Sequence, residues 1–176
     1  MNWRPNKQKD TFFSDNDISC IDAETLLWLK TLAVASPLKR ARLCLHKDTQ
    51  EQVQQMIIAL HSDTLFRPHR HPSGKSESIQ IIEGKLKTFY FDQSGNVLQT
   101  ITLSECIGEA AMIYRMSGGQ WHLPLNLTEW VVFHEIFTGP YDKTADVEYA
   151  HFAPAQENPV ELRKYCQQLL VSDKHD

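Results

Sequence analysis

The sequence predicts a mainly β fold, with a single antiparallel barrel or sandwich and helices before and after it. Short segments of alternating apolar and polar residues follow one another between residues 63 and 140. Glycine-rich turns separate them at intervals of about 8–12 residues, which is typical of such folds. A length of 176 residues fits one domain. We therefore expect residues 63–155 to form the barrel, with an arm, helices and a strand from 1–62 and a helix and tail from 156–176 packing on it.

The first elements are expected to be an arm and a helix. Residues 1–17 are mostly polar and are interpreted as a loose arm. Asp22 is a suitable N-cap for a helix over residues 23–35, where apolar residues recur at helical spacing. Ser36-Pro37 should end this helix, because a residue before proline disfavours the helical conformation.

Two further elements are expected before the barrel. Residues 40–46 alternate as a strand does. Thr49 and Gln52 fit a capping box, so residues 49–60 are predicted to form a second helix. The short basic cluster at residues 39–42 is interpreted as a solvated surface.

The barrel region itself is expected to consist of short strands. Segments with strand-like alternation cover residues 64–71, 77–83, 85–91, 97–103, 109–116 and 128–137. After them, Asn158 can cap a helix whose first residue is Pro159, a position that proline favours. A C-terminal helix is therefore predicted to run to about residue 171.

Charge and cysteine content narrow the classes of function. A net charge of −4 leaves no basic footprint for nucleic acid. The four cysteines lie far apart and include no C-x-x-C pair, so we expect free thiols in a reducing compartment. No stretch approaches the roughly 18 apolar residues of a membrane span, and the N-terminal segment lacks the apolar region of a secretion signal. We expect a cytoplasmic protein.

The segment RPHRHPSGKSES, residues 67–78, contains the first candidate site. His69 and His71 stand two residues apart, so on a strand they point to the same face and lie about 6–7 Å apart at Cα. Both imidazoles could then reach one metal ion. The alternative is an exposed pair of strand histidines.

Glu77 is the acidic residue that follows these histidines. On its strand it shares a face with Ile79 and Ile81, which should be the interior face. A buried carboxylate is costly unless it is paired or binds a metal, which gives Glu77 a reason to be a third ligand. The alternative is a salt bridge to Lys75 or Arg70.

A third histidine, His122, lies in the pattern G-x-x-H-x-x-x-N of residues 119–126. With the preceding H-x-H, the glutamate and a glycine seven residues after it, this pattern resembles the two signature motifs of the cupin superfamily. The resemblance covers roughly residues 63–140 and implies a jelly-roll β-barrel with a metal inside. Five residues separate the second histidine from the glutamate, where cupins more often have three or four. The ligands implied are His69, His71, Glu77 and His122.

Four segments are similar to the WbuC family of cupin-fold metalloproteins: SPLKRARLCLH, VQQMIIAL, RPHRHPSGKSES and FTGPY. That family is associated with bacterial polysaccharide gene clusters, especially those for O-antigen. The resemblance implies a divalent-metal-binding protein that acts on a small polar molecule such as a sugar or sugar-nucleotide. It leaves open whether the protein is an enzyme, of isomerase, epimerase or oxygenase type. The alternative is a non-catalytic module that binds or senses carbohydrate.

The remaining candidates concern the metal, the chemistry and the partners. Three imidazoles and one carboxylate suit Fe, Mn, Ni, Co or Zn. Glu135 could be a general base, although the alternation of residues 128–137 does not decide which face is interior. Arg67, Lys75 and Tyr90 are candidate substrate ligands. We expect a small-molecule ligand, no nucleic-acid or membrane partner, and a chain that could form a homodimer.

Overall fold

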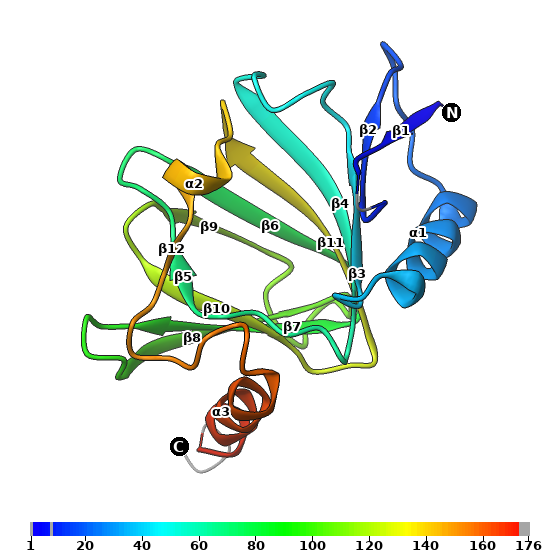
Figure 1. Ribbon diagram of the computed structural model, residues 1–176. Helices are drawn as coiled ribbons and strands as arrows, with labels where there is room; N and C mark the ends of the chain where they lie inside the picture. Colours follow the sequence, from blue (N-terminus) through cyan, green and yellow to red (C-terminus); the bar gives the residue numbers. More distant parts are fainter. Residues whose placement is uncertain (1, 8, 173–176) are drawn as a thin grey trace.

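Two β-sheets enclose the interior of a barrel in the computed structural model, which describes residues 2–7 and 9–172 (Figure 1). The strands are β1 (Trp3–Pro5), β2 (Thr11–Ser14), β3 (Arg40–Cys44), β4 (Val53–His61), β5 (His69–Arg70), β6 (Ser76–Glu83), β7 (Lys85–Phe91), β8 (Val97–Ser104), β9 (Ile113–Ser117), β10 (Trp121–Asn126), β11 (Trp130–Thr138) and β12 (Glu148–Tyr149). The helices are α1 (Ala23–Ala35), α2 (Lys143–Asp146) and α3 (Pro159–Ser172).

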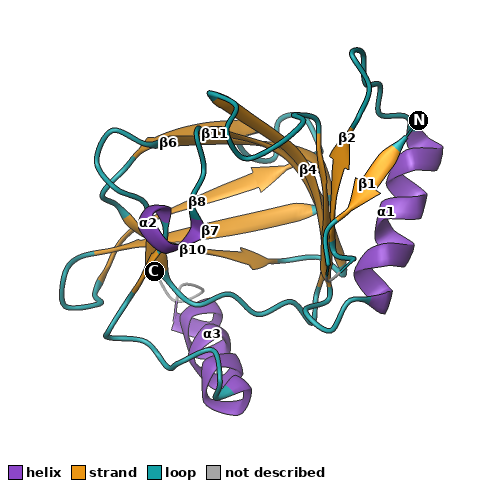
Figure 2. Ribbon diagram, turned by 45° about the horizontal axis from the view of Figure 1, so that its top comes forward, coloured by secondary structure: helices purple, strands orange, loops and turns teal. Residues whose placement is uncertain are grey.

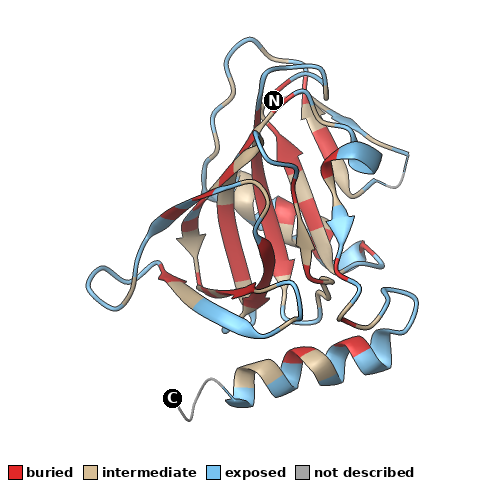
Figure 3. Cartoon of the chain, turned by 90° about the vertical axis from the view of Figure 1, so that its left-hand side faces the viewer, coloured by how far each residue is buried: buried red, intermediate tan, exposed pale blue. Residues whose placement is uncertain are grey.

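The larger sheet has the order β1-β2-β3-β4-β11-β6-β9, and the smaller sheet has the order β12-β5-β10-β7-β8. Neighbouring strands are antiparallel except for the parallel pair β2–β3. The predicted mainly β barrel with flanking helices is confirmed. Buried residues of both sheets belong to one core cluster inside the barrel, and Figure 3 shows buried positions in red along its strands.

Helix α1 covers the outer face of the larger sheet (Figure 2). Its Leu29 and Ala33 pack against Leu43 of β3 and Ile57 of β4. The predicted N-cap is confirmed, since the Asp22 carboxylate accepts a hydrogen bond of 2.8 Å from the backbone N–H of Thr25. The packing of α1 fixes which face of β3 and β4 points outward, and therefore which face points into the barrel.

The predicted second helix over residues 49–60 is wrong, because the chain forms β4 there. Met56, Ile58 and Leu60 point into the barrel core, while Ile57 and Ala59 pack under α1. A strand that is buried on both faces loses the apolar–polar alternation of a half-exposed strand. The capping-box pattern was misleading, since the residues before β4 form turns instead of a helix N-terminus.

The expected loose arm over residues 1–17 is wrong for its described strands, because β1 and β2 extend the larger sheet. Backbone pairing of Phe12 with Leu43 joins β2 to β3. The Phe12 side chain packs in the layer between the sheet and α1, whereas Phe13 packs against the barrel core.

Helix α3 covers the outer face of the smaller sheet, as the C-terminal helix prediction requires. Leu162 and Cys166 pack against Phe89, Phe91 and Leu123. All four cysteines are free, in line with the expected reduced thiols. Among the described residues, no helix is long and apolar enough to cross a bilayer.

Candidate metal centre

The three predicted histidines converge at one point inside the barrel. His69 on β5 stands directly opposite His122 on β10 in the sheet register, and His71 follows β5 by one residue. The ring centroids lie 4.3 Å apart for His69 and His122, 5.3 Å for His69 and His71, and 5.4 Å for His71 and His122. One nitrogen from each ring lies within 4.8 Å of the others. This spacing allows a single ion to contact all three imidazoles.

Main-chain carbonyls fix the orientation of each of these rings. The Nδ1 atoms of the three histidines lie 3.1, 2.7 and 3.0 Å from the carbonyl oxygens of Arg67, Asp146 and Gln120, respectively. A carbonyl can only accept, so each Nδ1 must carry the proton and donate it. The neutral ring then keeps its lone pair on Nε2. This arrangement is the usual support of metal-binding histidines, whose second nitrogen is held by the protein.

The electrostatic surroundings keep two of the rings neutral. Burial, and then the neighbouring His122 and His71, lower the pKa of His69 well below its usual range. Burial also lowers the pKa of His122. Since a metal ligand must be an unprotonated imidazole, these pKa shifts favour the ligand form at neutral pH.

Glu77 reaches the cluster from β6. Its side chain is buried, and Oε2 lies 3.0 Å from Nε2 of His71. Burial lowers the pKa of His71, but the hydrogen bond and negative charge of Glu77 outweigh this, and the pKa is raised. Glu77 is therefore in contact with the histidine cluster, although it stands outside the set of atoms that lie within 4.8 Å of one another.

A glycine turn accommodates the long interval between His71 and Glu77. The backbone N–H of Lys75 donates to the carbonyl of Pro72 over 3.1 Å, and Gly74 adopts a φ of +96° that favours glycine. The extra residue is taken up by this turn, so that Glu77 still meets His71. The alternative salt bridges are not formed, because Lys75 contacts Asp146 and Arg70 contacts Glu148.

These residues fit a divalent first-row metal ion. Three imidazole Nε2 atoms, that of His71 once it gives up the proton it shares with Glu77, and one buried carboxylate form a donor set that Fe, Mn, Ni, Co and Zn all accept. His69, His71 and His122 would hold the ion, with Glu77 as the adjacent carboxylate. The donor types do not distinguish among these metals.

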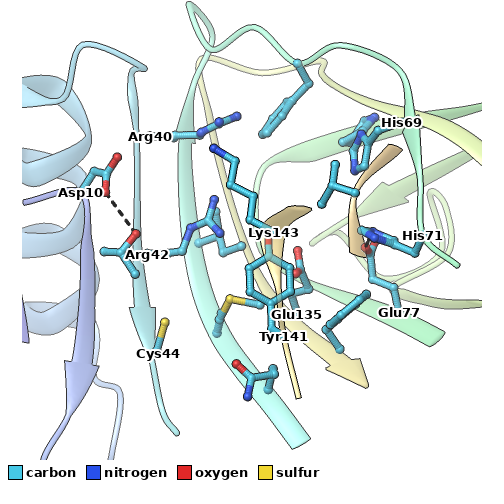
Figure 4. Close-up of a pocket in the computed structure, with 18 of the residues that line it drawn as sticks. Asp10, Arg40, Arg42, Cys44, His69, His71, Glu77, Glu135, Tyr141 and Lys143 are labelled. Carbon is cyan, nitrogen blue, oxygen red and sulfur yellow. Dashed lines mark hydrogen bonds and ion pairs between the residues drawn. The ribbon is translucent and has the colours of Figure 1, made fainter. Parts of the chain in front are cut away.

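The histidines line a cavity of about 510 Å³ inside the barrel (Figure 4). Glu135 of β11 also lines it, whereas His134 beside it does not. The interior face of β11 is therefore the one that carries Val131, Phe133 and Phe137, which the sequence pattern left open. Burial, and then the charge of Glu77, raise the pKa of Glu135 to about 8.

The three predicted substrate ligands occupy different places. Arg67 lines the cavity, and its Nη2 donates to the carbonyl of Ala150 over 2.6 Å. Lys75 does not line it; its ammonium donates to the carbonyls of Thr138 and Pro140. Tyr90 is buried in the barrel core and is not a lining residue either. The substrate roles of these three residues stay predictions.

Sequence reasoning missed the basic residues of the cavity. Arg40 and Arg42 of β3 point into it, together with Lys143 of α2 (Figure 4). The solvated-surface interpretation is therefore wrong for these two arginines. The available signal was the alternation of β3, in which Ala41 and Leu43 form the apolar face and the arginines form the other.

Comparisons with known proteins support the fold. A family described as "Domain of unknown function (DUF6016)" matches residues 21–103, which is a little under half of the chain. No curated protein matches the sequence. An oxalate oxidase in complex with the substrate analogue glycolate is similar in structure, with a TM-score of 0.50 and 14% identity over 71% of this chain and 62% of that chain.

Two other solved structures show weaker similarity. CapF with an inhibitor has a TM-score of 0.48 and 16% identity over 59% of this chain and 30% of that chain. A structural-genomics protein from Shewanella oneidensis has a TM-score of 0.47 and 12% identity over 57% of this chain and 63% of that chain. The chain thus spans less than two thirds of each protein's length. The likeness to oxalate oxidase shows that this chain has the cupin fold.

Proposed function

We propose that the protein is a divalent-metal-dependent cupin enzyme that acts on a small polar molecule in the barrel cavity. One observation carries this proposal: three imidazoles, each with Nδ1 held by a main-chain carbonyl, converge at the wall of a cavity of about 510 Å³. Such a cavity is large enough for a small ligand. Rings that served only to fill the core would not need three separately anchored orientations.

In this proposal, one group of residues binds the metal ion and Glu135 transfers protons. His69, His71 and His122 hold the ion, and the Glu77 carboxylate lies beside His71. When bound, a divalent ion supplies Lewis acidity or activates an oxygen ligand. Glu135 is the candidate acid–base group, because a pKa near 8 allows it to exchange a proton near neutral pH.

The finer assignment rests on the resemblance to the WbuC family. We propose a sugar or sugar-nucleotide of bacterial polysaccharide biosynthesis, such as O-antigen, as the molecule bound. The proposal includes a cytoplasmic location, a small-molecule ligand, no nucleic-acid or membrane partner, and a chain that can form a homodimer. The DUF6016 match carries no information about the reaction.

Metal analysis of purified protein tests the site. Wild type should retain about one divalent ion per chain after loading and dialysis, and His122→Ala should lose it. His151→Ala is the matched control, because His151 is exposed and lies outside the cavity. Equal metal content in wild type and His122→Ala would contradict the proposal.

Turnover assays test the reaction class. Loaded protein should be stabilised by some members of a set of sugars and sugar-nucleotides, and those members should be converted. Glu135→Gln should bind them while converting them more slowly. Binding without any conversion by wild type would refute the enzyme and favour the non-catalytic carbohydrate-binding module.

A further inference from the structure

We propose that Arg40, Arg42 and Lys143 form an oxyanion subsite in the barrel cavity, which binds a phosphate or carboxylate group of the ligand. The inference rests on the proposed function and deepens it, because it assigns a negative charge to the molecule that the cavity binds. The histidine cluster and these cations stand on different walls of the same cavity (Figure 4).

The register of the larger sheet directs both arginines inward. Arg42 of β3 pairs with Ile58 of β4, and Arg40 pairs with Leu60. Ile58 and Leu60 belong to the barrel core, so residues opposite them share the interior face. The arginines are two residues apart and therefore extend in the same direction.

Neither guanidinium has a hydrogen bond or ion pair with any residue in the described part of the chain. Arg70, by contrast, binds the Glu148 carboxylate through two hydrogen bonds of 2.7 and 3.0 Å. Arg40 stacks on Phe66 with Cζ 4.4 Å from the ring centroid, which holds the side chain but leaves its N–H donors available. Arg40 is thus an oriented donor, and neither arginine has an acceptor among the described residues.

This arrangement costs stability in the absence of a ligand. Burial, and then the charge of Arg42, lower the pKa of Arg40 to about 10, which still leaves it cationic at neutral pH. Arg40 and Arg42 are half-buried, and cations partly removed from water are unfavourable unless an anion compensates them. A bound anion would offset this cost.

The acids of the cavity do not supply that anion. Glu77 is paired with His71. Asp10 accepts hydrogen bonds from Asn6 and Thr11 at 2.8 and 3.1 Å, and its carboxylate forms no ion pair with either arginine. Glu135 forms no ion pair with Arg40 or Arg42 in the described part of the chain; their charges lower its pKa, but burial and the charge of Glu77 outweigh them. A bound anion would supply the partner that these acids do not.

The geometry of the cations indicates the chemical class. Guanidinium groups present paired N–H donors that match the oxygens of phosphate and carboxylate, and a lysine adds a mobile point charge. An uncharged ligand would leave both guanidinium groups unpaired. A molecule with an oxyanion at one end could place its other polar groups toward the histidines.

Binding of simple anions to the full-length chain tests the subsite. Inorganic phosphate and malonate are the probes, and each is titrated by calorimetry and thermal shift against metal-free and metal-loaded protein. The variants are Arg40→Gln/Arg42→Gln and Lys143→Gln. Arg115→Gln is the matched control, because Arg115 lies exposed on β9 and does not line the cavity.

In the metal-free protein, the double variant should bind the preferred anion at least tenfold more weakly, since a hydrogen bond to a charged group contributes about 1.5–3 kcal/mol and each 1.4 kcal/mol is tenfold. Lys143→Gln should weaken it less, and Arg115→Gln should not change it. Without anion, the double variant should melt no lower than wild type, because two unpaired like charges are removed. Stronger binding of phosphate than of malonate would identify a phosphoryl ligand. Stronger binding of malonate than of phosphate would identify a carboxylate ligand.

The subsite is refuted if wild type binds neither probe more tightly than the double variant does. It is also refuted if Arg115→Gln weakens binding as much. Metal content is measured in the same samples. If wild type and His122→Ala held equally little metal, the proposed function would be contradicted. If wild type still bound the anion in that case, the subsite would stand without it.

Discussion

Substitution of Gly118 by alanine should weaken metal binding without changing any ligand. Gly118 lies between β9 and β10, against the turn that joins His71 to Glu77. A Cβ atom at this position would stand 1.9 Å from the carbonyl oxygen of Pro72 and 2.6 Å from that of Lys75. Both atoms belong to backbone, so neither can rotate away as a flexible side chain would.

The required displacement follows from these distances. Real Cβ atoms essentially never approach another heavy atom closer than 3.0 Å, so the Pro72 carbonyl, now at 1.9 Å, must retreat by 3.0 − 1.9 = 1.1 Å or the β9–β10 turn must move equally. Metal–ligand distances tolerate only about 0.2 Å. We expect a loss of stability of about 1–3 kcal/mol from overpacking, and a 10–100-fold loss of metal affinity from the displaced His71.

Competition with a fluorescent chelator measures the metal affinity, and urea unfolding measures the stability. Gly108→Ala is the matched control: Gly108 has a φ of +91°, but no atom lies within 4 Å of its added Cβ. This variant should lose stability through backbone strain and keep its metal affinity. If Gly118→Ala kept its metal affinity within about twofold while losing stability, the reasoning that the turn positions His71 would be refuted.

Two further predictions concern the support of the site and its acid–base group. Lys75→Met should weaken metal binding about tenfold, because Lys75 bonds to the Thr138 carbonyl and lies 3.3 Å from the carboxylate of Asp146, whose backbone carbonyl anchors His71. The same chelator assay checks it, and an unchanged affinity relative to an exposed Lys164→Met control would contradict it. In metal-free protein, Glu135→Gln should become progressively more stable than wild type as pH rises from about 4.5 to about 8. The folded-state pKa of Glu135 is raised to about 8 by burial and Glu77, against Arg42, His71 and Arg40, so wild type loses stability over that window while glutamine does not. Urea unfolding at pH 5 and pH 8.5 measures the difference, and parallel curves for the two proteins would refute this assignment.

The histidine cluster was predictable because it depends on local rules and one remote match. His69 and His71 share a face through the two-residue period of a strand. His122 was found through the pattern of glycine and asparagine around it, and the sheet then pairs it directly with His69. The anchoring of His71 by Asp146 was not predictable, because α2 reaches the site only through the folded arrangement of the chain.

The second helix was predicted wrongly because of what covers β4. Ile57 and Ile58 are adjacent in sequence, yet one packs under α1 and the other faces the barrel. Local sequence reports apolar character, but only the tertiary structure decides whether one face or both are covered. The sequence likewise did not show whether Glu135 faces the barrel interior. Only the packing of β11 in the folded protein shows that it does.

Arg40 and Arg42 were predicted to lie on a solvated surface, but they line the cavity. A short run of basic residues is usually solvated. Because we applied that rule, we did not use the alternation of apolar and basic residues along β3. Leu43, buried under α1, was the residue that could have oriented the strand, because it forces its neighbours on either side to face the cavity.

The two walls of the cavity together favour a ligand-binding role over a purely structural metal. A structural ion needs only its ligands, and His69, His71, His122 and Glu77 could satisfy it alone. Such an ion gives no reason for unpaired guanidinium groups across the cavity, which cost stability in the folded protein. Binding and catalytic sites commonly lower the stability of a protein, because their polar groups stay unpaired until a ligand binds. The arginines of β3 are therefore the feature that most favours a substrate over a metal that only holds the barrel together.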